Sequence, residues 1–180
     1  MFRLAVPARD DSHSRSIPLL DAVGTQLGFI ANKLRLIGNS PAGLEADLGF
    51  SHTMNKTLDG KMRERIAVAV AQVNGCDDCL SAHSYLGSNM ARLDAAELAA
   101  SRSGHSNDMK ADPAIGFAKK VAETRGEVTD TDIETVKTAG YTDSQIVEIV
   151  LCVALNFLTN LVNKFGETEI DFPELYASAA

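Results

Sequence analysis

The stretch Glu64–His83, which reads ERIAVAVAQVNGCDDCLSAH, determines how the rest of the sequence is interpreted. Two of the three cysteines, Cys76 and Cys79, form a CxxC pair here, and His83 follows four residues after the second. If a helix begins near Gly75, these three residues occupy positions i, i+3 and i+7 and lie along one stripe of that helix. We interpret the stretch as a dithiol redox centre.

Glu64 lies on the segment that precedes the CxxC helix. Residues 61–73 are expected to be helical, and residues 74–75 to form a short turn between two antiparallel helices. At about 1.5 Å per residue, Glu64 lies roughly 15 Å from this turn along its helix, and His83 lies roughly 11 Å from it along the other. The two side chains are nearly level, so the spacing permits a Glu64–His83–Cys79 proton relay.

This chemistry depends on the types of residue at these positions, because the thiolate rather than the thiol attacks peroxides and disulfides. A cysteine at a helix N-terminus meets free backbone N–H groups, which can lower a thiol pKa from about 8.5 into the range of roughly 3.5–7.5. His83 is suited to accept the proton of Cys79, and Glu64 to orient the imidazole and balance its charge. Asp77 and Asp78 oppose this effect, since their charge repels a thiolate.

This pattern of a glutamate, eleven residues, CxxC, three residues and a histidine resembles the alkylhydroperoxidase D-like branch of the carboxymuconolactone decarboxylase superfamily. The segments Leu58–Arg65 and Asp171–Pro173, together with Asn160, are similar to its peroxidase-related members. The resemblance implies an all-α, single-domain helical bundle and a homo-oligomer, either trimeric or hexameric. It also implies a hydroperoxide substrate, a role in antioxidant defence and no bound cofactor.

The resemblance further implies a role for each residue of the motif. Cys79 would be the peroxide-reactive thiol, Cys76 would resolve it as a disulfide, and His83 and Glu64 would form the proton relay. A lipoyl-bearing or thioredoxin-like dithiol partner would then reduce the disulfide. Some characterised members carry a histidine or a tyrosine just before the later cysteine, where this chain has Asp78.

Composition limits the other classes of function. The chain has 180 residues, 45% of them apolar, which suits one domain with a continuous core. A formal charge of −7 and the lack of a dense basic cluster argue against nucleic-acid binding. Residues 1–16 are expected to form a polar N-terminal arm, followed by one alkylhydroperoxidase D-like domain over residues 17–180.

The same features suggest a location in the cytoplasm. Residues 1–9 contain no apolar secretory core, and three cysteines fit a reducing compartment better than a disulfide framework. The most apolar stretch, residues 146–162, is interrupted by polar residues and is expected to fall short of a membrane span. It exceeds what one helix face can hide, which indicates a subunit interface. Asn156 and Asn160 are expected to bond within this interface or to a neighbouring backbone group. Cys152 within it is interpreted as a small buried apolar residue.

Capping residues predict most of the remaining helices. Two further expectations concern the ends of the chain: a helix from Pro18 continues toward Gly38, and Asp171–Pro173 ends the ordered part, with a frayed tail after Tyr176. His52 and His105 are expected at the surface. The expected caps and the approximate extents of their helices are Ser40 (41–56), Asp59 (60–73), Asp94 with Glu97 (95–101), Asp112 (113–125), Thr131 with Glu134 (132–139) and Thr142 with Gln145 (143–165).

Four alternatives were weighed against the peroxidase interpretation. Ile66, Val68 and Val70 alternate with alanines as in a strand, which would suggest a thioredoxin-like fold, but no other segment supplies strands. A zinc site is disfavoured because Cys76 and His83 lie about 10 Å apart along a helix. A lactone decarboxylase would need the histidine and glutamate but not two cysteines. The fourth alternative is an interaction module with an inert cysteine pair.

Overall fold

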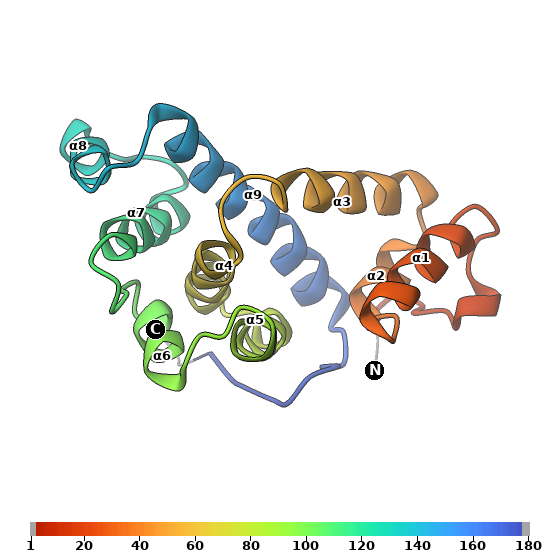
Figure 1. Cartoon of the computed structure of the whole chain (residues 1–180). Helices are drawn as coiled ribbons and strands as arrows, with labels where there is room; N and C mark the ends of the chain where they lie inside the picture. The colour runs from red at the N-terminus through yellow and green to blue at the C-terminus, as the bar shows by residue number, and fades with distance from the viewer. Residues whose placement is uncertain (1–2, 178–180) are drawn as a thin grey trace.

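Helices account for the regular structure of the computed structural model, which describes residues 3–177 (Figure 1). No strand occurs within this part of the chain, so the predicted all-α fold class is confirmed and a thioredoxin-like fold is excluded. A short 3-10 turn, η1 (Arg9–Asp11), precedes the first α-helix. The α-helices are α1 (Ile17–Leu27), α2 (Asn32–Ile37), α3 (Pro41–Met54), α4 (Gly60–Asn74), α5 (Asp77–Asn89), α6 (Ala95–Arg102), α7 (Ala111–Thr124), α8 (Asp130–Thr138) and α9 (Asp143–Gly166).

Helix α4 lies at the centre of the bundle, with α5, α6, α7 and α9 packed around it (Figure 1). Every residue from Ile66 to Ala71 is buried. The alternation of branched residues with alanines therefore reflects a helix with neighbours on all sides, not a strand. Burying each of the larger side chains contributes about 1.5–3 kcal/mol, so this helix anchors the core.

Helix α9 runs diagonally past α4, packs against it and forms the second long element of the core (Figure 1). By length and composition it is apolar enough to cross a membrane, which corrects the expectation that this stretch falls short. One face nevertheless packs against α4 and α7, as in the core helix of a bundle. The opposite face leaves an apolar stripe exposed, formed by Val147, Val150, Leu151, Leu158, Leu161 and Phe165.

Asn156 and Asn160, expected to bond within a subunit interface or to a neighbouring backbone group, both form hydrogen bonds inside the protomer. Asn156 Nδ2 donates to the carbonyl oxygen of Cys152 at 2.9 Å, and Asn160 Oδ1 accepts from Asn74 Nδ2 at 2.8 Å. Both asparagines are buried. The polar positions of α9 thus face α4 and α5, whereas its apolar stripe is the exposed side.

Several predicted caps are present, but the predicted starts of α7 and α8 were wrong. Helix α7 begins at Ala111, so Asp112 lies within its first turn and does not cap it. The side chains of Ser40, Asp59 and Thr142 cap α3, α4 and α9. Helix α8 is capped by Thr129 with Asp132, two residues earlier than predicted. Sequence spacing missed this because Thr129–Asp132 and Thr131–Glu134 offer the same capping pattern, and only the path of the chain from α7 selects between them.

The predicted continuation of the first helix toward Gly38 was also wrong. Helix α1 ends at Gly28, which has φ 82° and closes the helix in the left-handed region that glycine tolerates. A new helix, α2, begins at Asn32, whose side chain and backbone N–H both donate to Asp171 at 2.8 Å and 2.7 Å. The contact that starts α2 thus comes from the other end of the chain, so local sequence did not reveal it.

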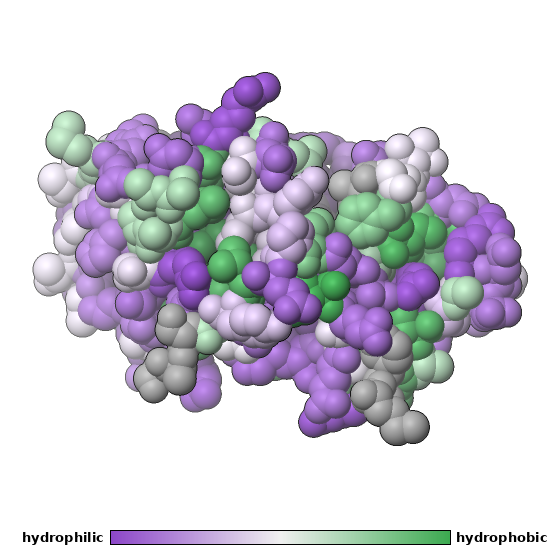
Figure 2. Space-filling model, turned by 90° about the horizontal axis from the view of Figure 1, so that it is seen from below, coloured by the Kyte–Doolittle hydropathy of each residue, from purple (hydrophilic) through white to green (hydrophobic). Residues whose placement is uncertain are grey.

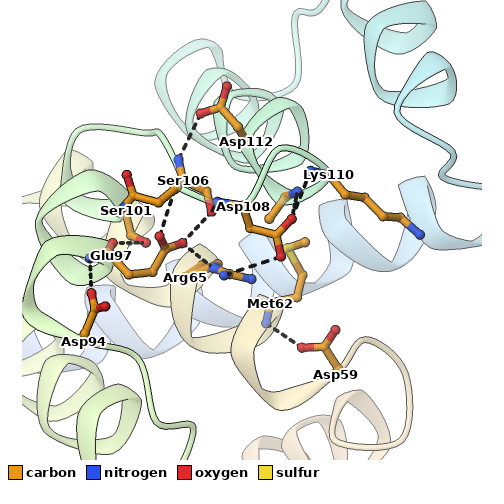
Figure 3. A network of polar contacts seen from close by, with 12 residues as sticks. Asp59, Met62, Arg65, Asp94, Glu97, Ser101, Ser106, Asp108, Lys110 and Asp112 are labelled. Atoms are coloured by element: carbon orange, nitrogen blue, oxygen red, sulfur yellow. Dashed lines mark hydrogen bonds and ion pairs between the residues drawn. The ribbon is translucent and has the colours of Figure 1, made fainter.

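Glu97 was predicted to complete a capping box with Asp94, but it has a different role (Figure 3). Asp94 accepts from the Glu97 backbone N–H, while the Glu97 carboxylate accepts from Arg65 Nε at 2.6 Å and from Asn107 N at 2.8 Å. Ser106 Oγ donates to the same carboxylate. Burial by itself raises the pKa of Glu97, but these hydrogen bonds outweigh it and the pKa is lowered. The ion pair ties α4 to α6 and to the loop before α7.

The C-terminal segment after α9 does not end at Pro173 as expected. It runs along the lower side of the bundle past α5 toward α6 (Figure 1), a face where hydrophobic and hydrophilic residues alternate (Figure 2). Leu175 N donates to Ser81 Oγ at 2.8 Å, and Ala177 N donates to Asp77 Oδ1 at 2.7 Å. This segment therefore covers the beginning of α5. The end of the tail, residues 178–180, lies outside the described residues.

Candidate functional site

The short turn between α4 and α5 brings the predicted relay residues together. Gly75 adopts φ 60° there, which glycine permits without strain, and the two helices then run antiparallel. Gly87 on α5 lies against Glu64, because a Cβ built at this glycine would lie 3.6 Å from the Glu64 Cβ. His83 Nδ1 and Glu64 Oε2 are 2.9 Å apart, so the helical spacing predicted this neighbourhood correctly.

This hydrogen bond fixes the orientation of the His83 ring. With Nδ1–H donated to the Glu64 carboxylate, Nε2 is left as the acceptor for a proton from another group. Both side chains are only partly exposed, which keeps their interaction stronger than it would be in bulk water. His83 therefore has the geometry of an oriented base.

Cys76 and Cys79 form a disulfide across the first turn of α5. Cys76 is the N-cap residue, and its Sγ accepts from the backbone N–H of Cys79 at 3.4 Å. The free N–H groups and the positive end of the helix dipole therefore act most directly on Cys76. When the disulfide is opened, the helix N-terminus favours a thiolate at Cys76 in particular, a distinction that spacing alone did not make.

Asn163 is a residue of the site that the sequence analysis missed. Its Nδ2 donates to Cys79 Sγ at 3.2 Å, and Thr168 Oγ1 donates to its Oδ1 at 3.0 Å, which holds the amide in place. A hydrogen bond donated to sulfur stabilises the charged form of a thiol. Asn156, Asn160 and Asn163 recur at i, i+4 and i+7 on an apolar helix, and this stripe of buried amides was the available signal.

A cavity of about 320 Å³ gives access to this arrangement. Cys79 is only 3% exposed, but it lines the cavity together with Glu64 and His83. Cys76 is 2% exposed and is not among the lining residues. A small molecule that enters the cavity therefore meets the Cys79 sulfur and not the Cys76 sulfur. The apolar part of the wall is formed by Leu34, Met54, Ala67, Leu86, Leu155 and Phe172.

Cys152 also lines this cavity, but its surroundings keep it unreactive. It is a buried free cysteine, as the sequence analysis expected. Burial, followed by the charge of Glu64, raises the pKa of the Cys152 thiol to about 12. It is therefore a neutral thiol near pH 7 and a poor nucleophile.

Acidic side chains gather at the side of the cavity formed by α2, α3 and the start of α5. Burial, then the charge of Asp171, raises the pKa of Asp78 to about 6. The pKa of Asp171 is also raised, mainly by burial. Asp47 is almost fully buried, and its Oδ2 atom lies 3.5 Å from the Lys33 ammonium nitrogen. The cavity that Cys79 lines thus has a negatively charged side.

The other candidate residues lie outside this site. His52 is exposed on α3, and His105 is an exposed loop residue whose Nδ1 lies 3.2 Å from Asp112 Oδ1. Within residues 3–177, no three or more His, Cys, Asp or Glu side chains are grouped so that they could hold a metal ion. The structure therefore brings together all four residues predicted for the site and neither of these two histidines.

Comparisons with known proteins agree with this architecture. Residues 42–124 match the model of the carboxymuconolactone decarboxylase family. No curated protein gives a significant match. One similar solved structure is the alkylhydroperoxidase AhpD core of an uncharacterized peroxidase-related protein from Ralstonia eutropha JMP134, with a TM-score of 0.83 and 22% sequence identity over 94% of this chain and 92% of that chain. Another is an uncharacterized peroxidase-related protein from Silicibacter sp. TM1040, with a TM-score of 0.82 and 21% sequence identity over 93% of this chain and 91% of that chain.

A third similar structure is named for a different reaction, debromination. It is a cysteine-to-alanine variant of the debrominase Bmp8 in complex with 2,3,4-tribromopyrrole (TM-score 0.75, 17% identity, 88% of this chain and 86% of that chain). Together, the fold and the site define a helical protein with a CxxC disulfide at a helix N-terminus. Residues 42–124 thus resemble the carboxymuconolactone decarboxylase family, and the chain has the fold of the alkylhydroperoxidase AhpD core.

The raised pKa of Asp78 predicts a pH-dependent effect of the Asp78→Asn substitution on stability. The folded state binds the Asp78 proton more tightly than the unfolded state, so this favourable contribution is complete below about pH 4 and is lost as the pH rises through about 6. We expect Asp78→Asn to increase the free energy of unfolding relative to wild type by about 1–2 kcal/mol at pH 7.5, after allowance for partial exposure, and by little at pH 4.5.

Urea denaturation of both proteins at the two pH values measures this difference. Glu45→Gln is the matched control, because it removes one carboxylate from an exposed position on α3. An increase of equal size at both pH values would contradict the burial of the Asp78 charge.

Proposed function

We propose that the protein is a dithiol peroxidase in which Cys79 reduces a hydroperoxide and Cys76 closes the disulfide. The observation that carries the proposal is the meeting of three features at one cavity: the Cys79 sulfur, the oriented His83–Glu64 pair and an opening for a small molecule. The family supports an enzymatic, peroxidase-related role at the coarser level.

The reaction balances in three steps. The Cys79 thiolate attacks the outer peroxide oxygen, the O–O bond breaks, and the sulfur becomes a sulfenic acid while the alkoxide takes up a proton to leave as an alcohol. The Cys76 thiolate then attacks the sulfenic sulfur, forming the disulfide and releasing water after protonation of the hydroxide. An external dithiol finally donates two electrons and two protons to restore both thiols.

His83 and Glu64 provide the proton transfer that the first step needs. Nε2 of His83 accepts the Cys79 proton and returns it to the departing alkoxide, while Glu64 stabilises the imidazolium formed in between. Asn163 stabilises the thiolate through its hydrogen bond to sulfur. The hydrogen bonds of His83 to Glu64 and of Asn163 to Cys79 support these roles.

The burial of the disulfide favours a slender reductant. Both sulfurs are almost fully buried, and the cavity leads to Cys79. A dithiol on a flexible arm, such as a lipoyl group, can reach Cys79 and displace Cys76 as a thiolate that the helix N-terminus stabilises. A dithiol on a protein surface, as in a thioredoxin-like partner, would need the cavity to open further. We place this cycle in the cytoplasm, as part of antioxidant defence.

The cysteine pair is tested by peroxide consumption with a panel of reductants that includes dihydrolipoamide. We expect the wild type to consume a small organic hydroperoxide with turnover. Cys79→Ser should abolish consumption, and Cys76→Ser should stop turnover after one oxidation of Cys79. Mass spectrometry of the reduced and peroxide-treated protein follows the sulfurs, with Cys152 as an internal control that should remain unmodified. Retention of both thiols after treatment would rule out the mechanism.

The relay is tested by the pH dependence of Cys79 reactivity in the reduced protein. His83→Gln should lower the rate constant with hydroperoxide at pH 7 by about 10²–10³-fold, and Glu64→Gln should lower it by about 10–100-fold, because thiolate formation loses its base or the partner of that base. Iodoacetamide alkylation of Cys79, measured across pH, should show the matching shift to higher pH. His105→Gln is the control for a surface histidine, and an unchanged profile in Glu64→Gln would exclude the relay.

We also propose that the apolar stripe of α9 joins copies of this chain into a homo-oligomer. The stripe runs the length of the helix on its exposed side, and a patch of this kind is usually covered by a partner. Leu161→Glu should shift the wild-type mass toward that of a monomer, as measured by light scattering after size exclusion. Met109→Glu, at an exposed apolar residue away from α9, should leave the mass unchanged. A wild-type monomer would disprove the proposal.

A further inference from the structure

Two carboxylate oxygens at the cavity have no hydrogen-bond partner among the described residues. They are Oδ1 of Asp47, on α3, and Oδ1 of Asp78, in the first turn of α5. Asp47 is only 3% exposed, and both residues line the cavity that contains Cys79. The peroxidase mechanism proposed above gives neither oxygen a function.

An unpartnered buried carboxylate oxygen is costly and requires an explanation. Lys33 offsets part of the charge, because its ammonium lies 3.5 Å from Oδ2 of Asp47 and its charge also acts on Asp78. Lys33 donates no hydrogen bond to the Oδ1 atom of either aspartate. The acidic residues that line the cavity outnumber the permanently basic ones. The acidic residues are Asp47, Asp78, Asp171 and Glu64, and the basic ones are Lys33 and Arg63.

The rest of the cavity limits the size and character of a ligand. Its volume of about 320 Å³ lies at the lower end of the range for small-molecule sites, and much of its wall is aliphatic or aromatic. A ligand that fits has one apolar ring or short chain. The remaining hydrogen-bond capacity at the acidic side is for donors, because ionised carboxylates only accept.

We propose that Asp47 and Asp78 form a specificity subsite that selects a small organic hydroperoxide with an apolar body and a cationic or N–H-bearing group, and that rejects carboxylate-bearing hydroperoxides. The charge of the two carboxylates attracts the donor group of the substrate to this side of the cavity while its peroxide group reaches Cys79. The proposal rests on the peroxidase function above, but the binding measurement described below tests the subsite without turnover.

The selection follows from the sign of the charge. A carboxylate brought within several ångströms of two carboxylates in a partly desolvated cavity is repelled, whereas an ammonium group is attracted. Asp78 is important here because it stands directly beside Cys79 in the sequence, where it orients one end of the substrate relative to the sulfur. Asp47 approaches from another helix, so the pair acts only in the folded chain.

Three matched probes separate charge from shape. They are cumene hydroperoxides that carry an aminomethyl, a methyl or a carboxylate group at the para position of the ring. We expect kcat/KM to be at least about tenfold higher for the ammonium probe than for the carboxylate probe, with the methyl probe between them. The corresponding product alcohols should show the same order of affinity for the oxidised protein in a thermal-shift titration.

Charge-removing variants locate the effect. In the Asp47→Asn and Asp78→Asn double variant, the ratio between ammonium and carboxylate probes should fall to within about twofold, since asparagine keeps the shape and removes the charge. Each single variant should lower the ratio in part. Glu45→Gln, which removes an exposed carboxylate from α3, should keep the wild-type ratio.

The outcomes distinguish this proposal from the peroxidase function on which it rests. If the methyl probe is not consumed, the peroxidase function fails, and the alcohol affinities alone decide whether the subsite exists. If the methyl probe is consumed but the three probes have equal kcat/KM, the subsite is overturned. It is also overturned if the double variant keeps the wild-type ratio, because the selection then originates elsewhere.

Discussion

The antiparallel contact between α4 and α5 is the constraint on which the site depends. The turn at Gly75 sets the register of the two helices, and Gly87 keeps a side chain from separating them at the level of Glu64. The His83–Glu64 hydrogen bond forms across this contact, and the same register places the CxxC pair at the end of α5 nearest the turn. A shift of one residue in either helix would rotate a side chain by about 100° and break the pair.

The two redox sulfurs occupy different environments although they are three residues apart. Cys76 caps α5 behind the C-terminal segment, whereas Cys79 borders the cavity and accepts a hydrogen bond from Asn163. In the cycle that we propose, this difference divides the roles between a sulfur that meets the oxidant and one that leaves as a thiolate. Cys152 lies at the same cavity in surroundings that raise its pKa, which illustrates that location alone does not make a thiol reactive.

Sequence patterns predicted those parts of the structure that rest on local geometry. The caps at Ser40, Asp59 and Thr142 depend on contacts three residues away, and they were predicted correctly. The break between α1 and α2 was missed because Asp171, far along the chain, supports the start of α2. Glu97 was misinterpreted for the same reason, since its carboxylate joins Arg65 on α4 instead of its own helix cap (Figure 3).

The sequence by itself determined the helical class, the CxxC pair and the approach of Glu64 to His83, because a helix of fixed rise and a two-residue turn leave little freedom over such a short stretch. The tertiary structure alone decided which sulfur faces the cavity, brought Asn163 to Cys79 and placed both Asp47 and Asp78 in the lining of that cavity. These residues come from helices far apart in the chain. Their meeting depends on how α3, α5 and α9 pack around α4, and no local spacing encodes that packing.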